Sequence, residues 1–221
     1  MRKKAVILAS GGVDSTTLLY DIKNRGYEVH ALSVHYNQRH SRELTYIKKT
    51  CKKLKIPHKI IDISVISKHL LGKNALTSKK ISVPAGDYKT ANMKLTVVPN
   101  RNMILLSLVS GYAITIGAGK VFYGAHTGDH AIYPDCRKVF VQALARAIQL
   151  AHWNPVKLEA PYLHLSKADI VKRGIKLGVD YSLTWSCYEG GKIACGKCGT
   201  CRERLTAFRK SGIADPVKYK V

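Results

Sequence analysis

The feature that most constrains this chain is a short glycine-rich turn near its amino terminus. Ser10-Gly11-Gly12-Val13-Asp14-Ser15 directly follows the apolar run 5–9. The two glycines allow positive φ and let backbone N–H groups approach an anion, and the helix expected from Asp14 onward points its free N–H groups and its positive dipole end at the same place. Ser10 and Ser15 add hydroxyl donors, and Asp14 can cap the helix or help to hold Mg²⁺. A strand, turn and helix in this order predict a phosphate-binding site in an α/β protein.

The composition limits what such a chain can be. Its 221 residues, 46% of them hydrophobic, suffice for one full core with a small appendage. No apolar run approaches the roughly 20 residues of a membrane span. The apolar stretch behind the basic start 1–4 is also too short for a signal peptide. We therefore expect a cytoplasmic protein whose six cysteines are reduced or bound to metal.

The net charge is strongly positive, because 37 basic residues against 14 acidic ones give +23. Such an excess attracts anions, whether nucleotides or nucleic acid. The basic residues are scattered through every segment and form no ladder with aromatic residues. Two interpretations therefore stay open: a nucleic-acid-binding face, or lysine spread over the surface. Nucleic acid is a possible partner but is not expected to take part in catalysis.

Short apolar segments alternate with amphipathic ones, which predicts a parallel sheet with helices on both faces. Strands are expected at 4–9, 28–36, 58–63, 120–125 and 157–162. Helices are expected at 14–24, 40–54, 102–117 and 137–151, and after Ser166 as N-cap. The apolar helix 102–117 should be wholly internal, and 70–95 should be a long loop, a candidate lid. We expect a nucleotide-binding α/β domain at 1–180 and a zinc-binding segment at 181–221 packed on it.

Four cysteines form the second strong pattern. Cys187, Cys195, Cys198 and Cys201 fall in one loop-rich stretch as Cys-x7-Cys-Gly-x-Cys-Gly-x-Cys. Four thiolates at this spacing can close a tetrahedron around one Zn²⁺ per chain, and the intervening glycines permit tight turns. Four sulfur ligands leave no open position for water, so the metal should be structural. An iron–sulfur cluster and a redox dithiol pair are alternatives, whereas compartment and spacing argue against disulfides.

The turn at 10–15 resembles the PP-loop of ATP pyrophosphatases, which adenylate a substrate and release pyrophosphate. It lacks both the lysine of a kinase-type P-loop and the three spaced glycines of a dinucleotide site. Further matching strings are Leu32-Ser33-Val34-His35-Tyr36-Asn37-Gln38-Arg39-His40, Val98-Pro99-Asn100-Arg101-Asn102, Gly128-Asp129-His130-Ala131-Ile132-Tyr133-Pro134-Asp135-Cys136-Arg137 and Thr184-Trp185-Ser186-Cys187-Tyr188. With the cysteine spacing, they resemble the 7-cyano-7-deazaguanine synthase family from about Ala5 to Phe208. Asn37 and Asn100 stand where that family usually has glycine. Asparagine tolerates positive φ well, so the same backbone is expected.

The resemblance implies a Rossmann-like PP-loop ATPase fold and a ligase that forms C–N bonds. In that family, ATP activates 7-carboxy-7-deazaguanine, ammonia gives the amide, and a second ATP-dependent activation dehydrates it to the nitrile. ATP, Mg²⁺, Zn²⁺ and a homodimer are implied with it. The alternatives are a tRNA-thiolating PP-loop enzyme, a relative that couples a deazaguanine to protein or serves DNA modification, and a non-enzymatic zinc module that binds nucleic acid.

The resemblance also implies which residues form the site. The expected nucleotide-binding residues are Leu8, Ala9, Ser10, Gly11, Gly12, Val13, Asp14, Ser15, Thr16, Thr17 and Leu18. The expected catalytic residues are Ser10, Asp14, Ser15, Arg101, Lys167, Asp129, His130, Asp135 and Arg137.

Arg101 and Lys167 are expected to add positive charge beside the departing pyrophosphate. Asp135 and Arg137 are candidates to read the polar edge of the deazaguanine. Asp129 and His130 are candidates to bind Mg²⁺ or to relay protons during the attack of ammonia. Other interpretations stay open: Lys167 as a solvent-facing charge and His130 as an ordinary loop histidine. Cys136 is expected to form part of the pocket wall, with a role as nucleophile as the alternative. His35, Gln38 and Arg39 are expected to line the site without an assigned role.

Overall fold

The computed structural model describes residues 3–87 and 91–220, and a parallel sheet forms the centre of this part of the chain. The five strands have the order β3-β2-β1-β4-β5. They are β1 (Lys4–Leu8), β2 (Glu28–His35), β3 (His58–Asp62), β4 (Lys120–Phe122) and β5 (Lys157–Glu159). The strand order reverses between β1 and β4. In open α/β sheets a crevice forms at such a point, beyond the carboxyl ends of the strands, and ligands bind there.

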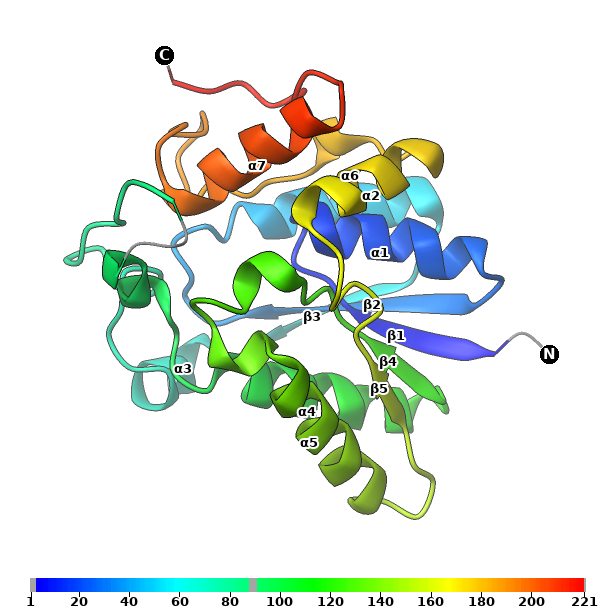
Figure 1. Cartoon of the computed structure of the whole chain (residues 1–221). Helices are drawn as coiled ribbons and strands as arrows, with labels where there is room; N and C mark the ends of the chain where they lie inside the picture. The colour runs from blue at the N-terminus through cyan, green and yellow to red at the C-terminus, as the bar shows by residue number, and fades with distance from the viewer. Residues whose placement is uncertain (1–2, 88–90, 221) are drawn as a thin grey trace.

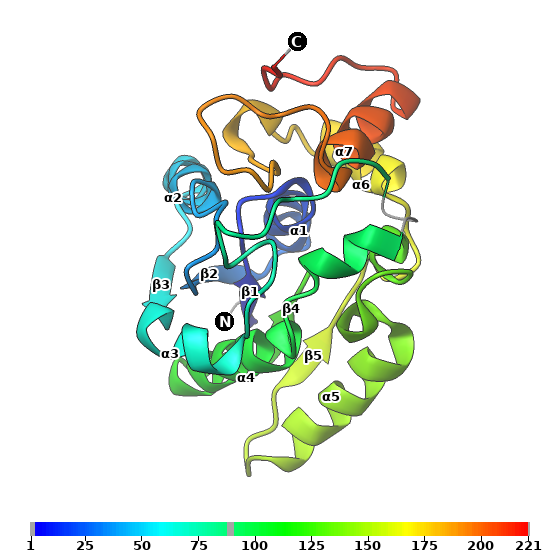
Figure 2. The same cartoon turned by 90° about the vertical axis from the view of Figure 1, so that its left-hand side faces the viewer.

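Helices cover both faces of this sheet, as the sequence predicts (Figure 1). On one face lie α1 (Val13–Asn24) and α2 (Glu43–Leu54), and on the other α4 (Arg101–Thr115) and α5 (Lys138–Leu150). The short α3 (Ser64–Leu70) follows β3, while α6 (Lys167–Lys176) packs on α1 and α7 (Gly199–Lys210) packs on α6. Figure 2 looks onto the carboxyl edge of the strands and shows the loop before α4 and the cysteine segment near the start of α1.

The first strand carries the centre of the core. Ala5, Val6 and Ile7 are fully buried. Because successive side chains of a strand point to opposite faces, Val6 belongs to the cluster that includes Leu106 of α4, and Ile7 to the cluster that includes Leu18 of α1. A strand buried on both faces needs an unbroken apolar run, which is what the sequence offers just before the glycine-rich turn.

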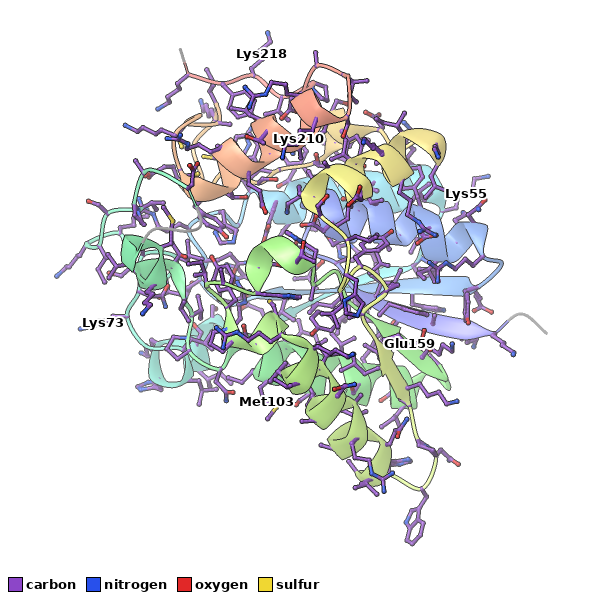
Figure 3. The ribbon with its side chains drawn as sticks, in the orientation of Figure 1. Lys55, Lys73, Met103, Glu159, Lys210 and Lys218 are labelled. Carbon is purple, nitrogen blue, oxygen red and sulfur yellow. The ribbon has the colours of Figure 1, made fainter. Side chains whose placement is uncertain are left out.

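The prediction that helix 102–117 is wholly internal is wrong. Leu106, Val109 and Ala113 are buried against the sheet, but Met103 is 40% exposed and points away from it (Figure 3). Apolar residues on the outer face of α4 raise its hydrophobicity without being buried. Sequence periodicity is weak in such a helix, so its two faces cannot be told apart from composition alone.

The other elements are found with shifted ends. The second helix begins at Glu43, three residues after the predicted start, and β4 and β5 end at Phe122 and Glu159, before the predicted ends. In the predicted loop 70–95 a 3-10 helix occupies Ala91–Thr96, and residues 88–90 lie outside the described residues, so the lid stays a prediction. The loop-rich cysteine segment also contains α7, whose start was not predicted.

The predicted positive φ is confirmed at the two asparagines that stand where the resembling family usually has glycine. Asn37 and Asn100 have φ of +63° and +55° and so occupy the left-handed region. The division into 1–180 and 181–221 stays a prediction, although Trp185 of the second segment donates its backbone N–H to the Gly11 carbonyl at 2.9 Å. Among the described helices, none has the length and apolar character needed to cross a bilayer. Lys55, Lys73 and Lys218 project from different sides of the molecule (Figure 3).

Candidate active site

The glycine-rich turn is held in a closed conformation by its own side chains. Ser15 Oγ accepts from the backbone N–H groups of Ser10 and Gly11, each at 3.2 Å. Gly11 has φ of +99°, and a Cβ there would collide with the carbonyl oxygen of Glu43, so only glycine fits. The helix begins at Val13 with Gly12 as N-cap and no side-chain capping bond, so Asp14 does not cap it. The two backbone N–H groups that could donate to a phosphate oxygen therefore donate to the Ser15 hydroxyl in this structure.

A cavity of about 210 Å³ opens beside this turn, at the reversal of strand order. Its lining residues include Ser10, Gly12, Asp14, Ser15, Tyr36, His40, Glu43, Arg101, Asn102, Tyr123, Asp129, Cys136, Lys167, Trp185, Tyr188 and Thr200. Six of the nine expected catalytic residues are in this set. They come from the turn after β1, from α1, from the starts of α4 and α6, and from the loop after β4. The fold thus gathers side chains that are far apart in the sequence.

Lys167 lies at the mouth of the PP-loop. Its Nζ is 2.7 Å from Asp14 Oδ2 and 3.2 Å from Glu203 Oε2, and its side chain is 13% exposed, so it is not a solvent-facing charge. Ser166 and Asp169 form the predicted capping box, which fixes where α6 begins and hence where Lys167 stands. Burial lowers the pKa of Lys167, but the carboxylates of Asp14 and Glu203 more than reverse this, and the pKa is raised. Lys167 is therefore a permanent cation.

Two carboxyl groups of the cavity have opposite pKa shifts. For Asp14, burial raises the pKa, but the charge of Lys167 and its hydrogen bond to the carboxylate lower the pKa by more, so the net shift is downward. For Asp129, burial dominates and raises the pKa to about 6. One group is thus anionic throughout the physiological range, whereas the other titrates near neutrality, which is the usual arrangement for separate electrostatic and proton-transfer roles.

His126 lies between these two carboxylates, and sequence reasoning missed it. Its Nδ1 accepts from the Gly128 N–H at 3.0 Å, so the ring proton is on Nε2. That nitrogen is 3.5 Å from Asp129 Oδ2 and 3.8 Å from Asp14 Oδ2. The side chain is fully buried, and burial lowers the pKa of His126, so a neutral donor faces both acids. Its position just after β4, at the ligand-binding edge, is the signal that could have found it.

Arg101 lines the same cavity from the start of α4. Its guanidinium carbon is 5.7 Å from the centre of the Tyr133 ring, and its Nε donates to Asn102 Oδ1 at 3.3 Å. Burial lowers its pKa, but the nearby Tyr36 and Asp135 raise it, and the net shift is upward. The left-handed Asn100 is the N-cap of α4, so the Asn100-Arg101 pair directs the cation into the cavity.

His40 and Glu43 also face the cavity, although neither was predicted as a site residue. His40 Nε2 is 3.6 Å from Glu43 Oε1. Burial raises the pKa of Glu43 to about 8, and burial with the charge of Arg101 lowers the pKa of His40 to about 3. His40 ends a string that the family resemblance contains, which is a usable signal. Glu43 carried none.

Three expected catalytic residues do not line the cavity. Asp135 Oδ2 accepts from the backbone N–H of Asn102 at 3.0 Å and so supports the start of α4. Arg137 is exposed, and its Nε donates to the carbonyl of His130 at 2.9 Å. His130 Nε2 is buried without a hydrogen-bond partner among the described residues.

The rest of the expected nucleotide-binding and lining residues divide in the same way. Leu8, Ala9 and Val13 line the cavity together with Ser10, Gly12 and Ser15 of the turn. Gly11, Thr16, Thr17 and Leu18 do not line it, since they pack into the interior. His35, Gln38 and Arg39 bond to Asp62, to the Tyr36 N–H and to Glu189 respectively. Cys136 is a buried part of the wall, and burial raises its pKa, so it is an unreactive thiol.

The four predicted metal ligands lie together beside this cavity. Their sulfur atoms all lie within 4.8 Å of one another. The backbone N–H groups of Cys195 and Cys198 donate to the sulfurs of Cys187 and Cys195, each at 3.3 Å. Cys198 is the N-cap of α7, and Cys201 lies in its first turn. Four sulfurs at this separation, on glycine-rich turns, form a site suited to a tetrahedral metal ion.

Comparison with known proteins gives a consistent result. The family model described as queuosine biosynthesis protein QueC matches residues 4–212. A 7-cyano-7-deazaguanine synthase of Caldicellulosiruptor saccharolyticus is 60% identical over 99% of this chain and 96% of that relative. A protein of the same name from Methanoregula boonei is 57% identical over 98% and 99%.

Solved structures share the fold at much lower identity. A 4-thiouridine synthetase, solved with RNA and bound ATP, is 15% identical with a TM-score of 0.52, over 95% of this chain and 50% of that one. The NH3-dependent NAD synthetase of Campylobacter jejuni is 18% identical with a TM-score of 0.50, over 82% and 66%. These two likenesses concern the fold alone.

Proposed function

The chain belongs to the QueC family of queuosine biosynthesis proteins, and from that premise we propose that it is a 7-cyano-7-deazaguanine synthase. It converts 7-carboxy-7-deazaguanine and ammonia into the nitrile with ATP. Relatives of this name that align along almost the whole chain support the proposal. The observation that carries the chemistry is the pairing of Lys167 with Asp14 at the mouth of the PP-loop cavity. That arrangement suits the transfer of AMP to a carboxylate.

The reaction has two activations. The substrate carboxylate attacks the α-phosphorus of ATP, and pyrophosphate leaves; ammonia then attacks the acyl carbon, AMP leaves, and a proton is released. The resulting amide attacks a second ATP through its oxygen, and pyrophosphate leaves again. Loss of one proton gives the O-adenylated imidate, and loss of AMP and a second proton gives the nitrile. Each activation converts a poor leaving oxygen into a good one. What the protein must supply is therefore positioning and stabilisation of the charge on the leaving pyrophosphate.

The PP-loop supplies that stabilisation. When phosphate oxygens arrive, Ser15 Oγ turns from an acceptor for the Ser10 and Gly11 amides into a donor, and those amides bind the anion instead. The first amides of α1 point at the same place, since they have no carbonyl partner within the helix. Lys167 and Arg101 both line the cavity and add two cations.

The residues present fit Mg²⁺ as the companion of ATP. Asp14 Oδ1 is buried and has no hydrogen-bond partner among the described residues, while Oδ2 binds Lys167. A hard cation prefers such a carboxylate oxygen together with phosphate oxygens and waters. Asp14 would hold the ion, which would neutralise charge on the triphosphate.

Asp129 is the proton acceptor for the attack of ammonia. It lines the cavity, and with a pKa raised to about 6 by burial it is ionised at neutral pH yet basic enough to take a proton. His126 Nε2 faces it from the buried side, 3.5 Å from Asp129 Oδ2. His130 serves no step from its present position, because it does not line the cavity. For Asp135 and Arg137 to read the deazaguanine edge, their side chains must leave the partners described above.

The cysteine cluster binds one structural Zn²⁺ per chain. Its donor set is four sulfurs, which favours zinc over a hard cation and leaves no position for a catalytic water. The expected homodimer and cytoplasmic location belong to the same proposal.

Mass spectrometry of a complete reaction tests the function. Purified protein with 7-carboxy-7-deazaguanine, ATP, Mg²⁺ and ammonium should give the nitrile, together with AMP and pyrophosphate. Omitting ammonium should leave AMP formation dependent on the acid and stop the nitrile. Formation of ADP and phosphate in place of AMP, or of thiolated tRNA in place of the nitrile, would refute the proposal.

A further inference from the structure

Lys167 has a second carboxylate partner that comes from the cysteine segment. Glu203 lies on α7, two residues after the cluster member Cys201, and its Oε2 is 3.2 Å from Lys167 Nζ. Both side chains are largely buried, at 18% and 13% exposure. Because Cys198 and Cys201 fix the first turn of this helix, the cysteine cluster also sets the place of the Glu203 carboxylate.

The loop after β4 is shaped around this carboxylate. A Cβ on Gly128 would collide with Glu203 Oε1 and would lie 2.7 Å from a ring carbon of His126. Gly128 has no side chain, so the loop can pass close to both groups. Its own N–H donates to His126. The absence of a side chain at Gly128 therefore leaves room for the Glu203 carboxylate that contacts Lys167.

We propose that Glu203 is the positioning residue for Lys167, through which the cysteine cluster sets the geometry of the nucleotide site. Asp14 and Glu203 both pair with the ammonium group of Lys167, but of these two only Asp14 lines the cavity. Once Asp14 is shared with a cation and the triphosphate, Glu203 is the carboxylate that keeps Nζ in place. It touches no substrate and acts only through Lys167. This inference rests on the proposed function, since it assigns Lys167 to the phosphates.

The test compares Glu203→Gln and Glu203→Asp with the control Arg202→Gln. Arg202 is the preceding residue on α7 and makes an exposed ion pair with Asp87 at 2.9 Å, so its loss disturbs the same turn without reaching Lys167. Glu203→Gln should lower kcat/KM for ATP by roughly 10- to 100-fold with metal content and melting temperature close to wild type. Glu203→Asp keeps the charge and should recover part of the loss. The control should change little.

MgATP affinity, measured by calorimetry, makes the result independent of the nitrile assay. If the wild type binds MgATP but forms no nitrile, the proposed function fails while Glu203→Gln still reports on Lys167. Wild-type affinity and kcat/KM in Glu203→Gln, or losses that merely follow lost metal or lost folding, would overturn the positioning role. Should Glu203→Gln not fold, Gly128→Ala displaces the carboxylate from the other side and should weaken MgATP in the same way; unchanged affinity there would equally overturn it.

Discussion

The PP-loop cavity and the cysteine cluster lie side by side but are built by opposite rules. The four sulfurs come from 15 consecutive positions, 187–201, and their separations already suit a metal ion. In the cavity, Asp14 and Lys167 are 153 residues apart, and Asp14 Oδ1, His126 Nε2 and His40 Nδ1 are buried without partners among the described residues. Unpaired buried polar atoms are costly. The cysteine cluster is thus arranged to stabilise the fold by binding a metal, whereas buried polar atoms of the cavity gain partners only when ligands bind.

The largest expected effect is a loss of folding stability when a ligand of the cysteine cluster is removed. Cys198→Ser removes one ligand of the cluster, and a structural zinc site is worth on the order of 10 kcal/mol of folding free energy. The variant should lose its metal and unfold at a much lower temperature, as followed by circular dichroism and metal analysis. A folded, metal-free variant with only slower turnover would show that the cluster is not structural.

Asp14→Ala should have the opposite effect, a loss of activity with little loss of stability. The helix N-terminus and the metal content of the cysteine cluster should persist, because Asp14 makes no capping bond. Pyrophosphate formation should fall by at least 10²- to 10³-fold, on the order of losing one preorganised electrostatic contact in an active site. Loss of metal from the cysteine cluster in this variant would break the separation between the regions. Asp62→Ala, an exposed carboxylate that pairs with His35, is the matched control and should retain activity.

The same difference explains what the sequence could reveal. The cysteine ligands and the PP-loop were predictable because each is a continuous pattern whose spacing carries the chemistry. Glu43, His126 and Glu203 were not, because their roles arise from packing between distant elements. Asp135 has the right chemical type, but its carboxylate supports the start of α4. Composition gave the apolar character of α4 correctly and its burial wrongly, since hydrophobicity does not say which face meets the sheet.

A smaller effect concerns pH and distinguishes the two acids of the cavity. The pKa of Asp129 is raised to about 6, so below pH 6 the group is protonated and cannot accept a proton from attacking ammonia. At a fixed concentration of unprotonated ammonia, the rate of amide formation should fall as pH drops through 6, approaching tenfold per pH unit. The pKa of Asp14 is lowered, so MgATP affinity should stay flat over the same range. A fall in MgATP affinity with a midpoint near pH 6 would contradict the assignment of this titration to Asp129 alone. In Asp129→Asn, the decrease of the rate below pH 6 should disappear.

The smallest expected effect tests whether the two regions share one backbone requirement, a residue with positive φ. Asn100, the residue before the cavity-lining Arg101, and Gly196 in the cysteine cluster both lie in the left-handed region, with φ of +55° and +73°. A Cβ on Gly196 would meet its nearest atom at 3.6 Å, so the side chain has room and only the backbone conformation matters. The exchanges Asn100→Gly and Gly196→Asn should each change the free energy of unfolding by about 1 kcal/mol or less, whereas alanine at either site should cost about 1–2 kcal/mol. Equilibrium urea unfolding of the four variants measures this. If Gly196→Asn lost metal or several kcal/mol while Asn100→Gly was silent, the turn between two sulfurs would demand more than a permissive φ, and the cluster would be the more tightly constrained region.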